Sequence, residues 1–286
     1  MTPRVQTFFD PATFTATYLV SDPTTGAAAV VDPVLDFAAN SARISTTSAD
    51  AILGAIRAKG LTLVYVLETH AHADHLSAAA YLRSETGAAI VIGARITEVQ
   101  KHFAALFEAD DILPDGGDFG RLAREGDELP LGDLIVRILE TPGHTAADVT
   151  YRIGDAAFVG DTLFMPDYGT ARTDFPGGDA AALYRSIRKI LDLPAKTRMF
   201  VGHDYLPPGR SEPRWETTVA EQRAANVHVH DGVTEDAFVK LRRARDATLA
   251  APALLLPSLQ VNIRAGALPK ASARGHVFLK LPVTVG

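Results

Sequence analysis

Short apolar segments separated by turn residues make up the beginning of the chain. Residues 5–9, 14–20 and 27–31 are rich in β-branched and aromatic side chains, and Asp22-Pro23 and Asp32-Pro33 interrupt or end them. This pattern is typical of antiparallel strands. From residue 49 the period changes, because residues 49–59 carry apolar side chains at helical spacing and Gly60 follows them.

The rest of the chain alternates between predicted strands and helices. Strands are predicted at residues 63–67, 89–92, 134–139, 149–153, 156–159 and 199–201, and helices at 76–84, 180–191, 214–226 and 234–248. The closely spaced strands between 134 and 159 require hairpins, which excludes a purely parallel sheet. Two mixed sheets flanked by helices therefore fit best, an α+β fold. The tail from residue 252 is poorly periodic.

Composition narrows the chemistry that the chain can perform. The 286 residues contain no cysteine, which excludes disulfides and thiolate metal sites, so a metal must sit on nitrogen and oxygen ligands. A net charge of -6 without a basic run argues against a nucleic-acid partner. The N-terminus resembles no targeting signal, and Pro252 interrupts the apolar stretch 247–256, so we expect a cytoplasmic protein that does not enter a membrane.

Ligand-type side chains follow the ends of four predicted core strands. The strand at 63–67 leads into His70, His72, Asp74 and His75, and three later strands lead into Gly143-His144, Gly160-Asp161 and Gly202-His203. So many ionisable groups would lose their water without compensation if they were buried unpaired. A bound metal supplies the missing partner. The remaining histidines, at 102, 228, 230 and 276, are expected to lie outside this site.

These motifs resemble those of the metallo-β-lactamase superfamily over about residues 5–226. The resemblance implies an αββα sandwich of two mixed sheets with the metal site at one edge. It also implies a catalytic domain at 1–226, with a C-terminal helical extension and tail at 227–286 packed on the same domain.

More specific motifs favour one branch of that superfamily. Thr-Pro-Gly-His-Thr at 141–145, Ala-Arg-Thr-Asp-Phe at 171–175 and Gly-His-Asp-Tyr at 202–205 are similar to the glutathione-linked branch that contains glyoxalase II and the persulfide dioxygenases. Arg-Thr-Asp-Phe and His-Asp-Tyr resemble the dioxygenases, and the loop 110–121, the segment 165–168 and the extended C-terminal tail resemble a bacterial type of them. Glyoxalase II usually has Arg-Phe-Phe-Glu and His-Glu-Tyr there.

By this resemblance, His70, His144 and Asp161 would hold one Fe(II) per chain, with three open coordination positions. The implied reaction oxidises glutathione persulfide with O2 and water to sulfite and glutathione. His72, Asp74, His75 and His203 would surround that site as outer ligand-orienting groups. The alternative is a hydrolase of glutathione thioesters, in which all seven residues hold two metals, zinc or a mixed pair. Because all seven residues are present, the set of possible ligands does not distinguish the dioxygenase from the hydrolase.

Four residues are candidates for binding glutathione: Thr145, Arg172, Tyr205 and Arg223. Arginine suits the carboxylates of glutathione, although Arg223 fits a solvated helix position equally well. Ala171 replaces the glycine that usually precedes Arg172, and the cysteine common in that motif is absent, which leaves the thiol carrier open. The apolar residues 254–256 leave room for a subunit interface, so the sequence allows a homodimer or a higher homo-oligomer.

Overall fold

Two six-stranded sheets form the centre of the computed structural model, which describes residues 2–283. The first sheet contains, in spatial order, β1 (Arg4–Asp10), β2 (Thr15–Ser21), β3 (Ala27–Val31), β6 (Thr62–Leu67), β8 (Ala89–Gly93) and β9 (Arg121–Ala123). The second contains β10 (Glu128–Leu131), β11 (Leu134–Glu140), β12 (Val149–Ile153), β13 (Ala156–Phe158), β14 (Arg198–Phe200) and β15 (Glu216–Thr218). A small sheet joins β5 (Arg43–Ser45), β4 (Val34–Ala38) and β7 (Leu76–Ser77).

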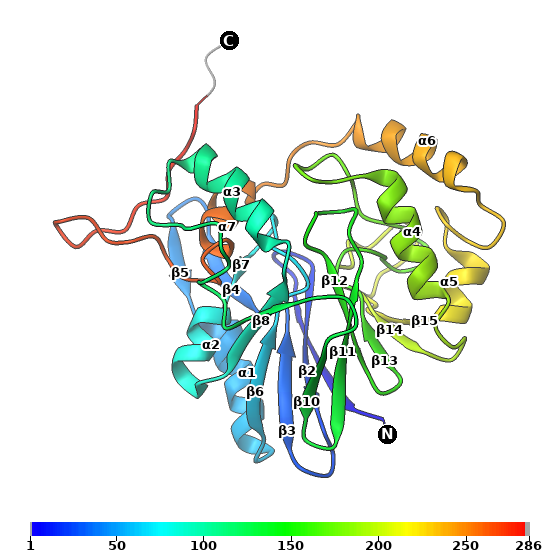
Figure 1. Ribbon diagram of the computed structural model, residues 1–286, viewed down its shortest axis with the longest axis horizontal. Helices are drawn as coiled ribbons and strands as arrows, with labels where there is room; N and C mark the ends of the chain where they lie inside the picture. The colour runs from blue at the N-terminus through cyan, green and yellow to red at the C-terminus, as the bar shows by residue number, and fades with distance from the viewer. Residues whose placement is uncertain (1, 284–286) are drawn as a thin grey trace.

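Helices cover the outer face of each large sheet (Figure 1). On the side of the first sheet lie α1 (Thr47–Ala58), α2 (Ala79–Thr86), α3 (Ile96–Phe107) and α7 (Leu255–Asn262). On the side of the second lie α4 (Ala180–Leu191), α5 (Val219–Ala225) and α6 (Glu235–Asp246). Both sheets mix parallel and antiparallel pairs. In the first sheet β3–β6, β6–β8 and β8–β9 are parallel, and in the second sheet only β13–β14 is parallel among the described strands. The predicted αββα sandwich is confirmed.

The strands supply side chains to two cores at once because successive residues face opposite sides of a sheet. In β3, Ala28 and Val30 pack toward the helices, whereas Ala29 and Val31 pack between the sheets. In β14, Met199 packs toward α4 and Phe200 lies between the sheets. The absence of polar alternation in these strands thus reflects burial on both faces.

The predicted helix at 214–226 is wrong in its first third. Residues 216–218 form β15, which pairs antiparallel with β14 at the edge of the second sheet. The helix begins only after Thr218, whose hydroxyl accepts from the backbone N–H of Glu221 while the Glu221 carboxylate accepts from the N–H of Thr218. This capping box fixes the start of α5. Likewise, Leu76–Ser77 pair with β4 as β7, so the helix predicted at 76–84 begins at Ala79.

Helix α7 was not predicted, because its residues are buried around most of its circumference. Ser258, Leu259, Gln260, Val261 and Asn262 are all buried, so no polar face marks a helical period. Leu255 and Leu256, which the sequence analysis considered for a subunit interface, are partly buried and pack against the first core, which lies between the first sheet and its covering helices.

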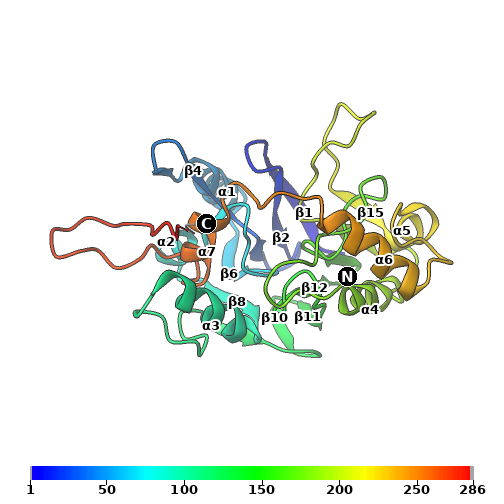
Figure 2. The ribbon, with the colours of Figure 1, turned by 90° about the horizontal axis from the view of Figure 1, so that it is seen from above.

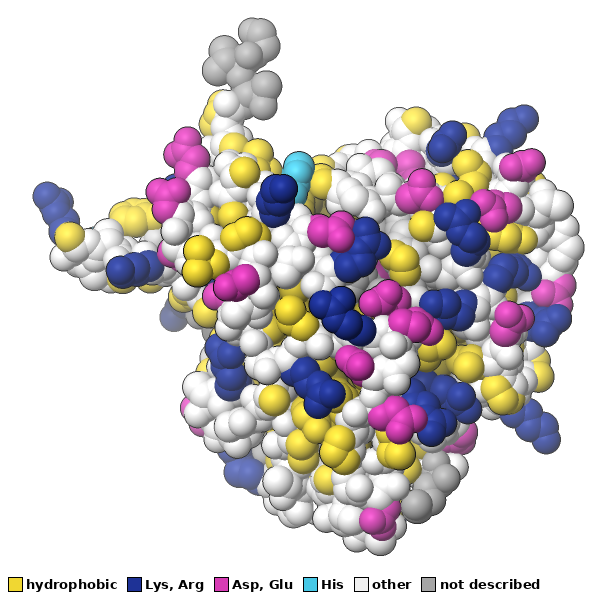
Figure 3. All heavy atoms as spheres, viewed as in Figure 1, with side chains coloured by type: hydrophobic (Ala, Val, Ile, Leu, Met, Phe, Trp, Pro, Cys, Tyr) yellow, Lys and Arg dark blue, Asp and Glu magenta, His cyan; other side chains and the backbone are white. Residues whose placement is uncertain are grey.

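After α6 the chain crosses from one helical layer to the other before it enters α7 (Figures 1 and 2). No helix within residues 2–283 is long and apolar enough to cross a membrane. On the face seen in Figure 3, basic and acidic side chains are interspersed, with no large basic patch.

Candidate metal centre

All seven predicted ligands gather where core strands of the two sheets end. His70, His72, Asp74 and His75 follow β6 of the first sheet, whereas His144, Asp161 and His203 follow β11, β13 and β14 of the second. They form two groups, each with one potential ligand atom per residue within 4.8 Å of the others. The groups are His70, His144 and Asp161, and His72, Asp74, His75 and His203.

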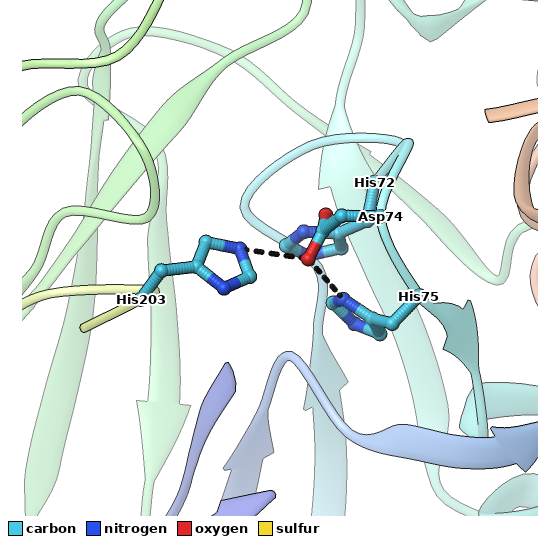
Figure 4. A group of neighbouring side chains, drawn as sticks. All are labelled: His72, Asp74, His75 and His203. Atoms are coloured by element: carbon cyan, nitrogen blue, oxygen red, sulfur yellow. Dashed lines mark hydrogen bonds and ion pairs between the residues drawn. The ribbon is translucent and has the colours of Figure 1, made fainter. Parts of the chain in front are cut away.

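The four-residue group is arranged around the carboxylate of Asp74 (Figure 4). Asp74 Oδ2 lies 3.2 Å from His203 Nε2 and 3.4 Å from His75 Nδ1. His203 reaches this point from the second sheet, so the group closes only when the two sheets pack together.

Asp161 lies between the two groups. Its Oδ2 is 3.7 Å from His144 Nε2, and its Oδ1 is 3.3 Å from His203 Nε2. One carboxylate can therefore face a metal in either group or bridge two metals.

The donor set fits a metal because its buried nitrogen atoms lack hydrogen-bond partners. Among the described residues 2–283, no group hydrogen-bonds to the buried atoms His70 Nε2, His75 Nε2 and His203 Nε2 or to either ring nitrogen of His72. Such atoms are costly in a protein interior unless something binds them. Their convergence with two carboxylates matches the nitrogen and oxygen ligation of zinc, manganese or iron.

Burial also keeps the key imidazoles in the form that binds metal. Burial and the neighbouring histidines hold the pKa of His70 and of His72 well below the usual value, so both rings are neutral. Burial opposes the charged form of His203 as well, but the carboxylates of Asp161 and Asp74 outweigh it and raise the His203 pKa. A metal would have to displace that proton, so its affinity should fall in acid.

Neighbouring groups orient His144 toward the site. Its Nδ1 lies 2.8 Å from the carbonyl oxygen of Arg172, an acceptor, so Nδ1 carries the proton and Nε2 keeps a free lone pair. Gly143, with φ of 145°, lets the chain pass against α4, where a Cβ would come within 2.3 Å of the backbone of Leu183.

Two acidic residues beside the site were missed by the sequence analysis. Asp32 Oδ1 lies 3.1 Å from His72 Nε2, and Glu68 Oε2 lies 3.8 Å from the same atom. Asp32 also accepts from the N–H and the hydroxyl of Thr69. Both acids directly follow strands, β3 and β6, and that position could have indicated them.

A cavity of about 370 Å³ opens onto this centre. His144, Asp161 and Asp74 line it together with aromatic and basic side chains: Phe14, Phe164, Tyr168, Arg172, Phe175, Tyr205, Arg242 and Arg245. The segment between α6 and α7 supplies Leu249, Ala250 and residues 252–254. The cavity thus combines a metal-ligand cluster with cationic groups suited to an anionic ligand.

The structure brings two of the four predicted substrate-binding residues to this cavity. Tyr205 and Arg172 line it, although Arg172 is already paired with Asp174 at 2.6 Å. Thr145 is buried, and its hydroxyl donates to Asp148 instead. Arg223 is half-exposed on α5, pairs with Asp231 and is not among the residues that line the cavity.

Arg242 and Arg245 were missed, although both lie in the predicted charged helix. They are three residues apart and therefore share a face of α6. Arg242 is buried against Asp246, whereas no ion pair involves Arg245 among residues 2–283. Of the cavity arginines, Arg245 is the one whose charge remains available to a ligand.

Comparison with known proteins points to one superfamily. The sequence profile of the Metallo-beta-lactamase superfamily matches residues 10–203. A beta-lactamase hydrolase-like protein of Agrobacterium fabrum is 52% identical over 99% of this chain, and a glyoxylase B2 of Dictyostelium discoideum is 45% identical over 98% of it. The chain spans 65% of the Agrobacterium protein and 97% of the Dictyostelium protein.

More distant relatives carry a different description. The mitochondrial persulfide dioxygenase of Homo sapiens is 30% identical over 90% of this chain and 87% of its own length. The crystal structure of ETHE1 from Myxococcus xanthus superposes with a TM-score of 0.74 at 31% identity, covering 92% of this chain and all of that one.

Proposed function

The chain belongs to the metallo-beta-lactamase superfamily, and on that basis we propose that it is a persulfide dioxygenase that oxidises glutathione persulfide with O2 and water to sulfite and glutathione. The observation that carries this proposal is the group of His70, His144 and Asp161 beside a cavity with cationic walls. Two histidines and one carboxylate with open positions are the ligand set of non-haem Fe(II) oxygenases. The likeness to the human persulfide dioxygenase supports the same reading.

A ferrous iron on these three ligands would supply the redox chemistry with O2. The protein's own contribution is to orient the ligands and to hold the substrate. The carbonyl of Arg172 keeps the His144 Nε2 lone pair directed at the centre. Arg245, which forms no ion pair within residues 2–283, offers its guanidinium to a glutathione carboxylate, and Tyr205 offers a hydroxyl and an aromatic face beside the ligands.

The cavity also has a wall that excludes water from one side of the ligand cluster. Phe164, Tyr168 and Tyr205 contact one another, with ring centroids 5.4 to 5.8 Å apart. The rings of Phe175 and His144 meet edge to face, with their centroids 5.4 Å apart. A small thiol-derived substrate would therefore meet the ligands in apolar surroundings, where its charge interacts more strongly with the fixed arginines.

A binuclear thioester hydrolase is the second candidate, and the position of Asp161 favours it. Its two oxygens face His144 and His203, as a carboxylate shared by two metals would. The names of the Agrobacterium and Dictyostelium relatives point the same way. In that case zinc or a mixed metal pair would activate water, and oxygen would not be consumed.

Oxygen uptake separates the two functions. Iron-loaded protein prepared without oxygen should consume O2 and release sulfite when glutathione persulfide is added, whereas the zinc-loaded protein should not. No uptake, together with about two metals per chain and hydrolysis of a glutathione thioester, would establish the hydrolase.

The variant His203→Ala adds a second criterion. It removes one ligand of the four-residue group but none of the three proposed to hold iron. We therefore expect His203→Ala to retain one iron per chain, whereas a binuclear hydrolase would lose its second metal and its activity. Loss of all iron from this variant would contradict the mononuclear assignment.

A further inference from the structure

The side chain of Asn262 connects the C-terminal helix α7 to the loop that carries four metal-ligand side chains. Asn262 is 4% exposed. Its Nδ2 donates to the carbonyl oxygens of His72 and His75, each at 2.8 Å, and its Oδ1 accepts from the backbone N–H of Ser77 at 2.8 Å. Both donors and the acceptor of the Asn262 amide are thus hydrogen-bonded to three backbone groups within residues 72–77.

The ligand loop has few restraints of its own. Residues 70–75 lie in no helix or strand, and no backbone–backbone hydrogen bond within residues 2–283 begins or ends in them. Buried backbone polar groups are nearly always paired. Asn262 therefore supplies, from about 190 positions away in the sequence, two bonds that a regular element would have supplied locally.

Helix α7 is well anchored, so Asn262 can act as a fixed support. Val261 and Ile263 on either side of it are fully buried in the first core. The side chain of Gln100 on α3 donates to the carbonyl of Ile263 at 3.0 Å. At Gly266, with φ of 84°, an added Cβ would lie 2.7 Å from the carbonyl oxygen of Ser77, so the chain after α7 packs directly against the end of the ligand loop.

We propose that Asn262 is a positioning residue of the metal centre, which fixes the backbone of the loop so that His72 and His75 present their rings to the metal. The C-terminal segment, beyond the residues 10–203 that match the superfamily profile, would then complete the ligand site. This inference concerns the geometry of the loop, and it holds whether the centre performs oxygen chemistry or hydrolysis.

The chain offers a matched control on the same helix. Gln260 is also a buried amide, 2% exposed, but its Nε2 donates to the carbonyls of Leu256 and Lys280, and its Oε1 accepts from the N–H of Lys280. Gln260→Ala therefore removes a comparable set of hydrogen bonds without touching the ligand loop. Asn262→Ala removes all three loop bonds, whereas the near-isosteric Asn262→Asp keeps the acceptor for Ser77 and loses the two donors.

Two measurements on the full-length protein test the proposal. In the metal-free state, hydrogen exchange at the amides of residues 70–77 should be at least about tenfold faster in both Asn262 variants than in Gln260→Ala. With Co(II) as the probe, chelator competition should show affinity about 10–100-fold weaker for both Asn262 variants, which is the usual effect of losing an outer group around a metal site. The visible absorption bands of bound Co(II) should change in the same variants, because the ligand geometry changes.

Equal exchange rates and equal Co(II) affinity in the Asn262 and Gln260 variants would overturn the proposal. If Asn262→Ala does not fold, Asn262→Asp carries the comparison, since it preserves the size of the side chain. Because the probes are hydrogen exchange and the metal alone, a failed persulfide assay would count against the proposed function and leave this result intact.

Discussion

Replacing Asp246 by alanine should strongly destabilise the protein, because it leaves the guanidinium of Arg242 buried without its partner. Arg242 is 1% exposed and Asp246 is 6% exposed. Asp246 Oδ1 accepts from Arg242 Nε at 2.9 Å and lies 2.8 Å from Arg242 Nη2. Asp246 Oδ2 accepts from both the N–H and the hydroxyl of Thr173, at 2.9 Å each. Loss of the carboxylate thus leaves four donor contacts unsatisfied.

The expected cost follows from that count. Removing one partner of a buried ion pair typically costs about 3–5 kcal/mol, since the remaining charge has lost its water and gains nothing in return. Burial already lowers the pKa of Arg242 despite the nearby Asp246, which is the same desolvation effect. We therefore expect Asp246→Ala to lose about 3–5 kcal/mol in the free energy of unfolding measured by urea titration.

The variant should also weaken substrate binding. Arg242 Nη1 donates to the carbonyl of Thr170 and Asp246 accepts from Thr173, so the pair holds both ends of the segment 170–173, in which Thr170, Ala171 and Arg172 line the cavity. Asp246→Ala frees that segment, so KM for the proposed substrate, glutathione persulfide, should rise even where the protein remains folded.

Two comparisons decide whether the reasoning is correct. Asp231→Ala breaks the ion pairs with Arg223 and Arg188, but Asp231 is about half exposed in both, so the variant should change stability little. The double variant Asp246→Leu with Arg242→Met should recover part of the loss, because no buried charge remains. If Asp246→Ala and Asp231→Ala were equally stable, the buried pair would not hold the segment as described.

Three further outcomes are expected. Gly143→Ala would place a Cβ 2.3 Å from the backbone of Leu183, so it should cost about 1–3 kcal/mol or more and lower the bound metal per chain by displacing His144, as checked by thermal unfolding and metal analysis. Burial and the charges of nearby arginines lower the pKa of His228 to about 4, and its Nδ1 accepts from the N–H of Thr170. The folded protein therefore binds fewer protons at His228 than the unfolded chain does. About 2 kcal/mol of the free energy of unfolding, present above pH 6.5, should be lost as the pH falls toward 4. A His228→Asn variant whose stability falls with pH in the same way would refute this. Removing the metal with a chelator should lower the free energy of unfolding by about 4 kcal/mol relative to protein with free metal at about a thousand times Kd, and unchanged thermal unfolding would contradict a metal in this site.

The cluster of ligand-type residues could be predicted because its signal is local. An apolar strand followed within a few residues by histidine or aspartate, as at His144 and Asp161, indicates both a metal-binding side chain and its position at the edge of a sheet. The spacing of the same strands required hairpins and favoured two mixed sheets flanked by helices, whereas the αββα order was implied by the resemblance of the motifs to the superfamily. These features depend on residues that are neighbours in the sequence.

The features of the fold and the site that the sequence did not predict depend on contacts between segments that are distant in the sequence. Only the packing of the two sheets brings Asp161 between His144 and His203, and only the docking of α6 brings Arg242 and Arg245 to the cavity while Arg223 stays on the surface. Helix α7 escaped prediction because burial around the helix erases the polar face that marks a period. The bonds from Asn262 to the ligand loop were equally invisible, since an asparagine side chain can pair with almost any backbone group, and the tertiary structure alone decides which one lies within reach.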